Sequence, residues 1–147
     1  MKIRKATKRD FNNISNLIKE EYWKHYKEKW TIESALETLN HYKKVGKIFV
    51  GEIEKRIVGV IIIREEEYNG RKTLMVEELV VNGDLQGKGL GKKLMMFVEG
   101  YCKKNNIKRI WLITGKDASA FGFYKKIGYK HEEKTVYFSK KVILNSK

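Results

Sequence analysis

The sequence has no proline and only one cysteine, Cys102, among its 147 residues. A lone cysteine cannot form a disulfide within the chain, and no apolar run of the signal-peptide type precedes Ile3. The longest apolar stretch, from Ile57 to Ile63, contains a glycine and is far shorter than the roughly 20 residues that cross a bilayer. We therefore expect a cytoplasmic protein that is not embedded in a membrane.

Metal-binding patterns are also missing. His25, His41 and His131 are far apart in the sequence and form no ligand spacing with Cys102 or with acidic residues. Cys102 falls on the apolar face of a predicted helix, where it is most simply a small buried side chain. We expect no metal site.

The charge is strongly of one sign. The sequence has 32 Lys and Arg against 18 Asp and Glu, which gives a net charge of +14. Nucleic-acid-binding proteins share such an excess, but here it is spread along the chain and is mostly lysine, whereas base-reading surfaces rely on arginine. We expect a solvated lysine-rich surface, no nucleic-acid partner, and a positive field that attracts a polyanion.

The length and the 41% of hydrophobic residues predict a single domain, residues 1–147, and apolar periodicity predicts that it mixes helices and strands. The predicted helices cover residues 11–22, 32–42, 90–102 and 117–127. The predicted strands cover residues 3–7, 47–53, 57–64, 74–81 and 107–114, with two closing strands from 129 and over 135–143. The order strand, helix, strand over 74–114 predicts one parallel pair.

Turn and cap residues mark the boundaries of these elements. Short polar links at Glu54 to Arg56 and at Asn69-Gly70 predict two hairpins. Thr7 followed by Asp10 predicts a capping box, and Gly46 is expected to be a left-handed helix stop.

A glycine-rich turn follows the strand that ends at Val81. It reads Gln86-Gly87-Lys88-Gly89-Leu90-Gly91 and opens a helix that continues with Lys92 and Lys93. Glycines let backbone N–H groups approach an anion, and the helix dipole adds positive potential. The pattern matches neither the P-loop nor Gly-x-Gly-x-x-Gly. It predicts a pyrophosphate site in preference to a plain glycine-rich connection.

Two motifs resemble those of one family. The Gln-x-x-Gly-x-Gly pattern of Gln86 to Gly91 resembles the acetyl-CoA-binding motif of the GNAT superfamily of N-acetyltransferases. The stretch from Asp117 to Tyr129 resembles the family pattern Asn-x-x-Ala-x-x-Phe-Tyr-x-Lys-x-Gly-Phe. The resemblance covers nearly the whole chain. It implies a GNAT-like α/β (α+β) fold, a mixed and mostly antiparallel central sheet of about six or seven strands flanked by about four helices.

The resemblance implies acetyl-CoA as the acetyl donor, with no metal. The main chain of Leu79, Val80 and Val81 would face the pantetheine arm. The phosphates would be held around the turn by Gln86, Gly87, Lys88, Gly89, Leu90, Gly91 and Lys92. Asp117 stands where the family has Asn, so it either contacts the cofactor or only caps a helix.

Glu77 and Tyr124 are the candidates for catalysis, because amine attack on a thioester needs a base and an acid for the departing thiolate. Strand alternation places Glu77 on the same face as Leu79 and Val81. Glu78 then points to the other face in a structural role. Glu77 resembles the family's glutamate base, and a salt bridge to a lysine is its alternative. Tyr124 aligns with the family's tyrosine acid, and a core aromatic is its alternative.

The resemblance thus implies direct acetyl transfer to a primary amine of a small molecule or a protein. The alternative is a non-catalytic acyl-CoA-binding or regulatory domain that keeps the turn. Tyr22, Trp23, Tyr26 and Trp30 lie where the family builds its acceptor pocket, or they only pack together. Dimers are frequent in the family, so a homodimer is an option.

Overall fold

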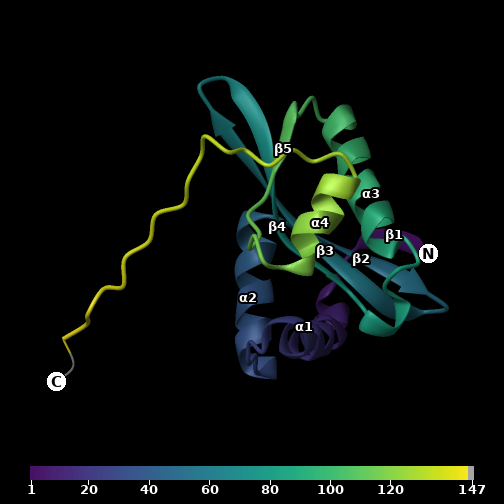
Figure 1. Cartoon of the computed structure of the whole chain (residues 1–147). Coiled ribbons are helices and arrows are strands. Elements are labelled where there is room, and N and C mark those ends of the chain that lie inside the picture. The colour runs from purple at the N-terminus through teal and green to yellow at the C-terminus, as the bar shows by residue number, and fades with distance from the viewer. Residues whose placement is uncertain (146–147) are drawn as a thin grey trace. The chain divides into compact units, whose positions relative to one another are not determined.

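The computed structural model describes residues 1–145. It divides into two units, Met1–Ile113 and Thr114–Lys147. The elements of the first unit are β1 (Lys2–Lys5), η1 (Lys8–Asp10), α1 (Phe11–Tyr26), α2 (Ile32–Val45), β2 (Lys47–Ile53), β3 (Arg56–Tyr68), β4 (Arg71–Val81), η2 (Gly83–Leu85), α3 (Leu90–Lys104) and β5 (Arg109–Trp111). The second unit contains α4 (Ser119–Lys126), and Figure 1 labels the main elements.

The sheet has five strands in the order β1-β2-β3-β4-β5. Every neighbouring pair is antiparallel except β4 and β5, which are parallel. The mixed, mostly antiparallel sheet with one parallel pair is therefore confirmed. The expected count of about six or seven strands is too high, because only five form among residues 1–145.

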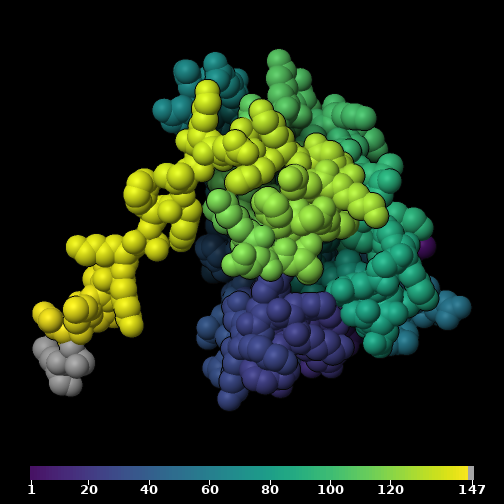
Figure 2. Space-filling model, viewed as in Figure 1, coloured from purple at the N-terminus to yellow at the C-terminus, as the bar shows by residue number. Residues whose placement is uncertain are grey.

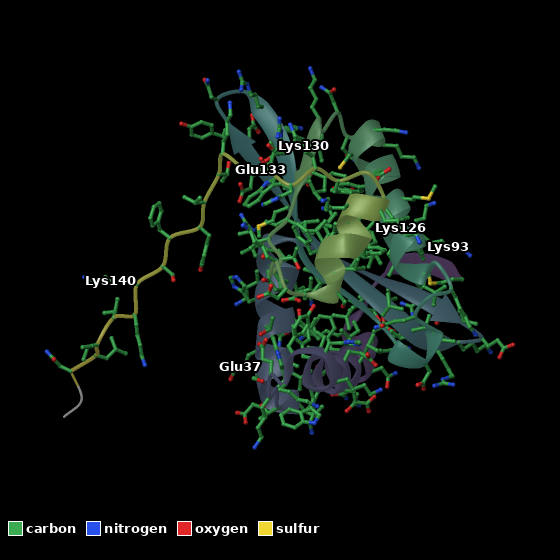
Figure 3. The ribbon with its side chains drawn as sticks, in the orientation of Figure 1. Glu37, Lys93, Lys126, Lys130, Glu133 and Lys140 are labelled. Atoms are coloured by element: carbon green, nitrogen blue, oxygen red, sulfur yellow. The ribbon has the colours of Figure 1, made fainter. Side chains whose placement is uncertain are left out.

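The two predicted closing strands do not form. Residues 129–145 contain no strand, and Figure 3 shows Lys140 on this drawn-out segment. Its apolar side chains are solvent-exposed, with Phe138 at 89% and Ile143 at 90%. Apolar β-branched residues favour a strand only where a neighbouring strand accepts their backbone hydrogen bonds. The sequence pattern cannot supply that neighbour.

Both predicted hairpins are confirmed. Glu54 and Lys55 have φ angles of 49° and 64°, and Asn69 and Gly70 have φ angles of 50° and 72°. Positive φ at both central residues is the mark of a type I′ turn, whose twist matches that of the strands it joins. These turns place β3 between β2 and β4.

Two apolar layers cover the sheet of the first unit. On one face α1 and α2 pack over Val60 and Ile62, within a cluster that also contains Ile14 and Leu39. On the other face lies α3, where the rings of Phe49 and Phe97 are 4.9 Å apart. Figure 1 shows α1 and α2 on the side of the sheet opposite to α3.

Helix boundaries follow the cap residues, with one exception. The capping box of Thr7 and Asp10 is present. Gly46 is not a left-handed stop, because its φ of −148° is extended backbone. A Cβ at Gly46 would lie 2.4 Å from the carbonyl oxygen of Ile63. Glycine is therefore needed there for a close approach of two backbones.

The second unit contains a short helix. It begins at Ser119 with Ala118 as its N-cap, so of the two alternatives considered for Asp117 the helix cap is wrong. Gly128 follows the helix with a φ of 98°, the left-handed conformation in which glycine often ends a helix. No helix in the described part of the chain has the length and hydropathy of a membrane span.

Candidate functional site

A β-bulge in β4 lies at Glu77. Opposite β4, Ile62 faces Glu78 and Ile63 faces Val76, so Glu77 is an extra residue in the strand. Glu77 bonds to α2 and Glu78 bonds to α1, and both helices cover the same face of the sheet. The expectation that these two side chains point to opposite faces is wrong, because a bulge interrupts strand alternation.

Glu77 is held in an ion pair. Arg64 Nε donates to Glu77 Oε1 at 2.8 Å, and the Tyr42 hydroxyl donates to Oε2 at 3.1 Å. Burial, with the neighbouring Glu77 charge, raises the pKa of Tyr42 to about 12, so its hydroxyl remains a donor at neutral pH. The salt bridge considered as an alternative role for Glu77 is present, with an arginine in place of a lysine.

Glu78 has a different environment. Its carboxylate accepts a hydrogen bond from the Tyr22 hydroxyl. Burial raises the pKa of Glu78 to about 6, although the bond from Tyr22 favours the charged form. The nearby carboxylates of Glu28 and Glu77 also contribute to this raised pKa. A carboxyl group with a pKa near 6 can gain or lose a proton close to neutral pH, which a purely structural glutamate does not require.

The aromatic residues of α1 and the segment after it form a cluster beside Glu78. The ring of Tyr22 lies 5.4 Å from those of both Tyr26 and Trp30. Trp23 is exposed at 52%, with the Lys27 ammonium 5.3 Å from its ring centroid. Three of the four residues considered for an acceptor pocket therefore pack together, next to a carboxylate.

One edge of β4 is free over half of its length. β5 pairs with β4 only at Thr73 to Met75. From Val76 to Val81, no strand in the described part of the chain lies along the edge opposite β3. Free backbone N–H and C=O groups of such an edge pair readily with an extended ligand.

The register identifies the groups at that edge. The Asn82 N–H donates to Val58 O at 2.8 Å, and Val80 lies opposite Val60 in the ladder. The alternation of an antiparallel ladder therefore turns the N–H and C=O of Val80 toward β3. Those of the next residues on either side, Leu79 and Val81, turn toward the free edge.

The glycine turn has the backbone that an anion site needs. Gly87 and Gly89 have φ angles of 82° and 77°. A Cβ at either residue would meet nothing within 4 Å, so both glycines border open space. α3 begins directly after Gly89, and neither a capping side chain nor an acidic residue occupies its first turn. The N–H groups at Leu90, Gly91 and Lys92 have no acceptor within an α-helix.

Basic and amide side chains surround the turn. Lys88, Lys92 and Lys93 are all exposed, and Figure 3 labels Lys93 in the first turn of α3. Gln86 Nε2 donates to Val81 O at 3.3 Å, so this side chain bonds back to the end of β4. The structure thus brings the free edge, Gln86, the glycines and the lysines together within one unit.

Tyr124 and Asp117 lie in the second unit. Tyr124 is half-buried on α4, its ring 5.1 Å from Phe123 and 6.0 Å from Tyr129. No residue of α4 is fully buried, so Phe121 and Phe123 are half-buried side chains and not core. Asp117 is exposed.

Several residues of the site are not evident from the sequence. Arg64 and Tyr42 bind Glu77, and Glu21 of α1 accepts a hydrogen bond from the Gly83 N–H in the loop after β4. These partners are separated in sequence by 13 to 62 residues. The adjacent acidic pair Glu77-Glu78 is the one local signal that points to this region.

Neither a metal-binding cluster nor the cysteine forms a second candidate site within residues 1–145. Within residues 1–145, no three His, Cys, Asp or Glu side chains are grouped so that they could hold a metal ion. Cys102 is buried, as expected for a small apolar side chain, and burial raises the pKa of its thiol.

Three solved N-acetyltransferases have a similar fold. The aminoglycoside antibiotic 6'-N-acetyltransferase of Acinetobacter haemolyticus is 18% identical with a TM-score of 0.74, covering 97% of this chain and 100% of that one. The ribosomal-protein-alanine N-acetyltransferase of Brucella melitensis biovar Abortus 2308 is 16% identical with a TM-score of 0.76, and the match covers 98% of this chain and 99% of that one. The glucosamine-6-phosphate N-acetyltransferase of Arabidopsis thaliana is 23% identical with a TM-score of 0.72, and the match covers 95% of this chain and 97% of that one.

A family model gives the same assignment from the sequence. The model described as the acetyltransferase (GNAT) family matches residues 15–129, which span the carboxylate pair, the glycine turn and α4. The chain belongs to the acetyltransferase (GNAT) family and is an acyltransferase.

Proposed function

We propose that this protein transfers an acetyl group from acetyl-CoA to a primary amine of a small molecule or a protein. The observation that carries the proposal is the continuity of the free β4 edge with the glycine turn and the uncapped start of α3. An extended arm that ends in a pyrophosphate fits this path, because the edge offers amide partners and the turn offers anion-binding N–H groups.

The residues of the turn suit acetyl-CoA. The outward N–H and C=O groups of Leu79 and the outward N–H of Val81 are suited to the amides of the pantetheine arm, whereas the Val81 carbonyl already accepts from Gln86 Nε2. The amides from Gly87 to Lys92 are suited to the pyrophosphate, since a Cβ would meet no atom within 4 Å at Gly87 or Gly89. Exposed lysines at the start of α3 add positive charge.

The chemistry requires one proton acceptor and one proton donor. The amine nitrogen forms a bond to the thioester carbon, the C–S bond breaks, and the thiolate takes a proton. We propose Glu77 or its neighbour Glu78, directly or through water, as the acceptor of the amine's proton. The pKa of Glu78 near 6 favours Glu78, because it is ionised at neutral pH yet basic enough to take a proton. We propose the Tyr124 hydroxyl as the donor to the thiolate, on the basis of its motif.

The acceptor is not selected by the fold. The three similar structures are named for an aminoglycoside, a ribosomal-protein alanine and a sugar phosphate amine. A cytoplasmic setting fits the single, buried and unpaired cysteine. The competing function is a domain that binds acyl-CoA without catalysis.

Calorimetric titration with acetyl-CoA tests the binding site. The wild type should bind with a dissociation constant on the order of micromolar, and Gly89→Glu should abolish binding, because it places a carboxylate at the anion site. Gly70→Glu is a matched control, since Gly70 also has a positive φ of 72° with nothing within 4 Å of a Cβ. It should bind as the wild type does. Equal binding by both variants would place acetyl-CoA elsewhere.

A thiol-release screen tests catalysis. Acetyl-CoA is incubated with amines of each class, and the free thiol of CoA is measured. Release that depends on the amine supports acetyl transfer. Binding without release for every amine class would favour the non-catalytic domain.

A further inference from the structure

A buried carboxylate lies where α1 meets the loop after β4. Glu21 is 3% exposed, although glutamate is rarely buried. Its Oε1 accepts a hydrogen bond from the Gly83 N–H at 2.9 Å. Lys24 and His25, on the next turn of α1, lie 3.4 Å and 3.3 Å from its two oxygens. The hydrogen bond from Gly83 and the Lys24 ammonium offset part of the cost of burying this carboxylate.

Gly83 is shaped to receive that carboxylate. A Cβ at Gly83 would lie 2.9 Å from Glu21 Oε2 and 3.2 Å from Oε1. Gly83 has no positive φ, so its backbone conformation does not require glycine. The absence of a side chain is needed for the approach of Glu21.

The other end of the same loop is also tied to α1. Gln86 Nε2 lies 3.1 Å from His25 Nε2 and donates to Val81 O at 3.3 Å. His25 Nε2 forms an ion pair with Glu21 Oε2 when the imidazole is protonated, and in the tautomer with an unprotonated Nε2 it accepts from Gln86 Nε2. Side chains from two successive turns of α1 therefore contact both Gly83 and Gln86. Figure 2 shows the teal and green surface around residues 82–91 beside the purple surface of α1.

The glycine turn has no comparable support of its own. Gly87 and Gly89 border open space, and Lys88 between them is exposed. The direction in which the turn leaves β4 is therefore set by the loop that precedes it. That loop, η2 with Asn82 and Gln86 at its ends, is held by α1.

We propose that Glu21 is a positioning residue for acetyl-CoA. Its carboxylate fixes Gly83, and through Gly83 it holds the amides of the glycine turn in the arrangement that receives the pyrophosphate. This proposal rests on the proposed function, in which acetyl-CoA binds at that turn. Preorganised donors bind an anion without a further ordering cost, so loss of Glu21 weakens binding. Glu21 bonds the loop and not Glu77 or Glu78, so turnover of the bound substrate is preserved.

The test uses three variants of the full chain and one control. Glu21→Ala removes the acceptor, Glu21→Gln keeps a carbonyl oxygen that can accept from Gly83, and Gly83→Ala displaces the carboxylate without changing its charge. Glu20→Ala, one residue earlier and exposed, is the control. Calorimetry gives the dissociation constant for acetyl-CoA, steady-state rates give KM and kcat, and thermal melts report folding.

The expected pattern is a loss of affinity without a loss of turnover. Glu21→Ala and Gly83→Ala should raise the dissociation constant and the KM for acetyl-CoA by about tenfold to a hundredfold. The kcat should stay within about twofold, Glu21→Gln should recover most of the affinity, and Glu20→Ala should match the wild type. Hydrogen exchange of the amides over residues 82–91 should be faster in Glu21→Ala than in the wild type without ligand.

Each other result contradicts the proposal. Wild-type affinity in folded Glu21→Ala or Gly83→Ala overturns it, and so does a fall in kcat with unchanged affinity. If Glu21→Ala does not fold, the Gly83→Ala and Glu21→Gln pair decides, since a wild-type KM in Gly83→Ala overturns the proposal. A wild type that binds no acetyl-CoA overturns the proposed function as well, whereas a binding wild type with unaffected variants overturns this proposal alone.

Discussion

The two adjacent carboxylates of the bulge differ in their partners. Glu77 is paired with the guanidinium of Arg64, whereas Glu78 accepts a hydrogen bond from the neutral phenol of Tyr22. Burial then raises the pKa of Glu78 to about 6. Two residues of the same type, one position apart, can therefore serve as an anchored charge and as a group that titrates near neutral pH.

The first prediction concerns the pH dependence of acetylation. The rate should fall more steeply below a pH of about 6, by a further tenfold or so per unit, because protonated Glu78 cannot accept the amine's proton. Glu78→Gln should lose this steepening. Glu77→Gln should move it to lower pH, because loss of a neighbouring negative charge lowers the pKa of Glu78. A pH–rate profile in Glu78→Gln equal to that of the wild type would assign the proton to Glu77 or to water.

The second prediction is that Tyr124→Phe slows turnover by on the order of a hundredfold while acetyl-CoA affinity stays unchanged. The change removes the hydroxyl and keeps the ring, so thermal stability should be close to that of the wild type. Tyr129→Phe is the control, because it also removes one hydroxyl and the Tyr129 ring centroid lies 6.0 Å from that of Tyr124. This variant should keep the turnover of the wild type. Full activity in Tyr124→Phe would assign Tyr124 to packing alone.

Among the elements, α1 organises the candidate site. Consecutive residues of this helix, Glu21 and Tyr22, hold the loop after β4 and the carboxylate of Glu78. A helix is stiff over a few residues, so the two contacts keep a constant separation. In the proposed function, the phosphate end and the acceptor end of the site therefore share one support.

Close approach of elements gives the third prediction. Gly46→Ala should destabilise the protein by about 1 to 3 kcal/mol, because the new Cβ overlaps the Ile63 carbonyl, a backbone atom that cannot rotate away. Gly100→Ala is the control. Its Cβ meets nothing within 4 Å on α3, so the change should stabilise the protein by about 0.5 to 1 kcal/mol. Urea denaturation measures both, and the same sign for the two variants would contradict the account of Gly46.

Patterns within elements were predictable wherever neighbouring residues decide them. The hairpins at Glu54 to Arg56 and at Asn69-Gly70 and the capping box at Thr7 follow from local chemistry, and all three are confirmed. The left-handed stop at Gly46 was wrong, because a tertiary contact with Ile63 determines the conformation there. The cap at Asp117 was wrong, because the N-cap is Ala118, one residue later.

At the scale of the molecule, the charge of +14 suits a polyanionic ligand. The fourth prediction is that the KM for acetyl-CoA rises by about threefold to tenfold between about 0.05 and 0.3 M salt, while kcat is unchanged. Replacement of Lys88, Lys92 and Lys93 by glutamine should flatten this dependence. Lys103 and Lys104 end α3, and Lys108 follows the helix. Replacement of these three lysines by glutamine should change the salt dependence of KM less.

Equal flattening by the two triple variants would mean that the field of the whole molecule, and not the lysines at the turn, attracts the ligand. A nucleic-acid-binding protein would instead bind duplex DNA with an affinity that falls steeply with salt, which the same titration series can measure.

The sequence by itself determined the family, through the resemblance of its two motifs. It also determined the mixed sheet and the glycine turn, because helical and strand periods and turn residues act over a few neighbouring positions. Tertiary structure alone decided the bulge that turns Glu77 and Glu78 to one face, and the close contact of the Glu21 carboxylate with Gly83. Each of these depends on register or on close approach between segments far apart in the chain. Such distances are set by the packing of the whole unit, and no local pattern encodes them.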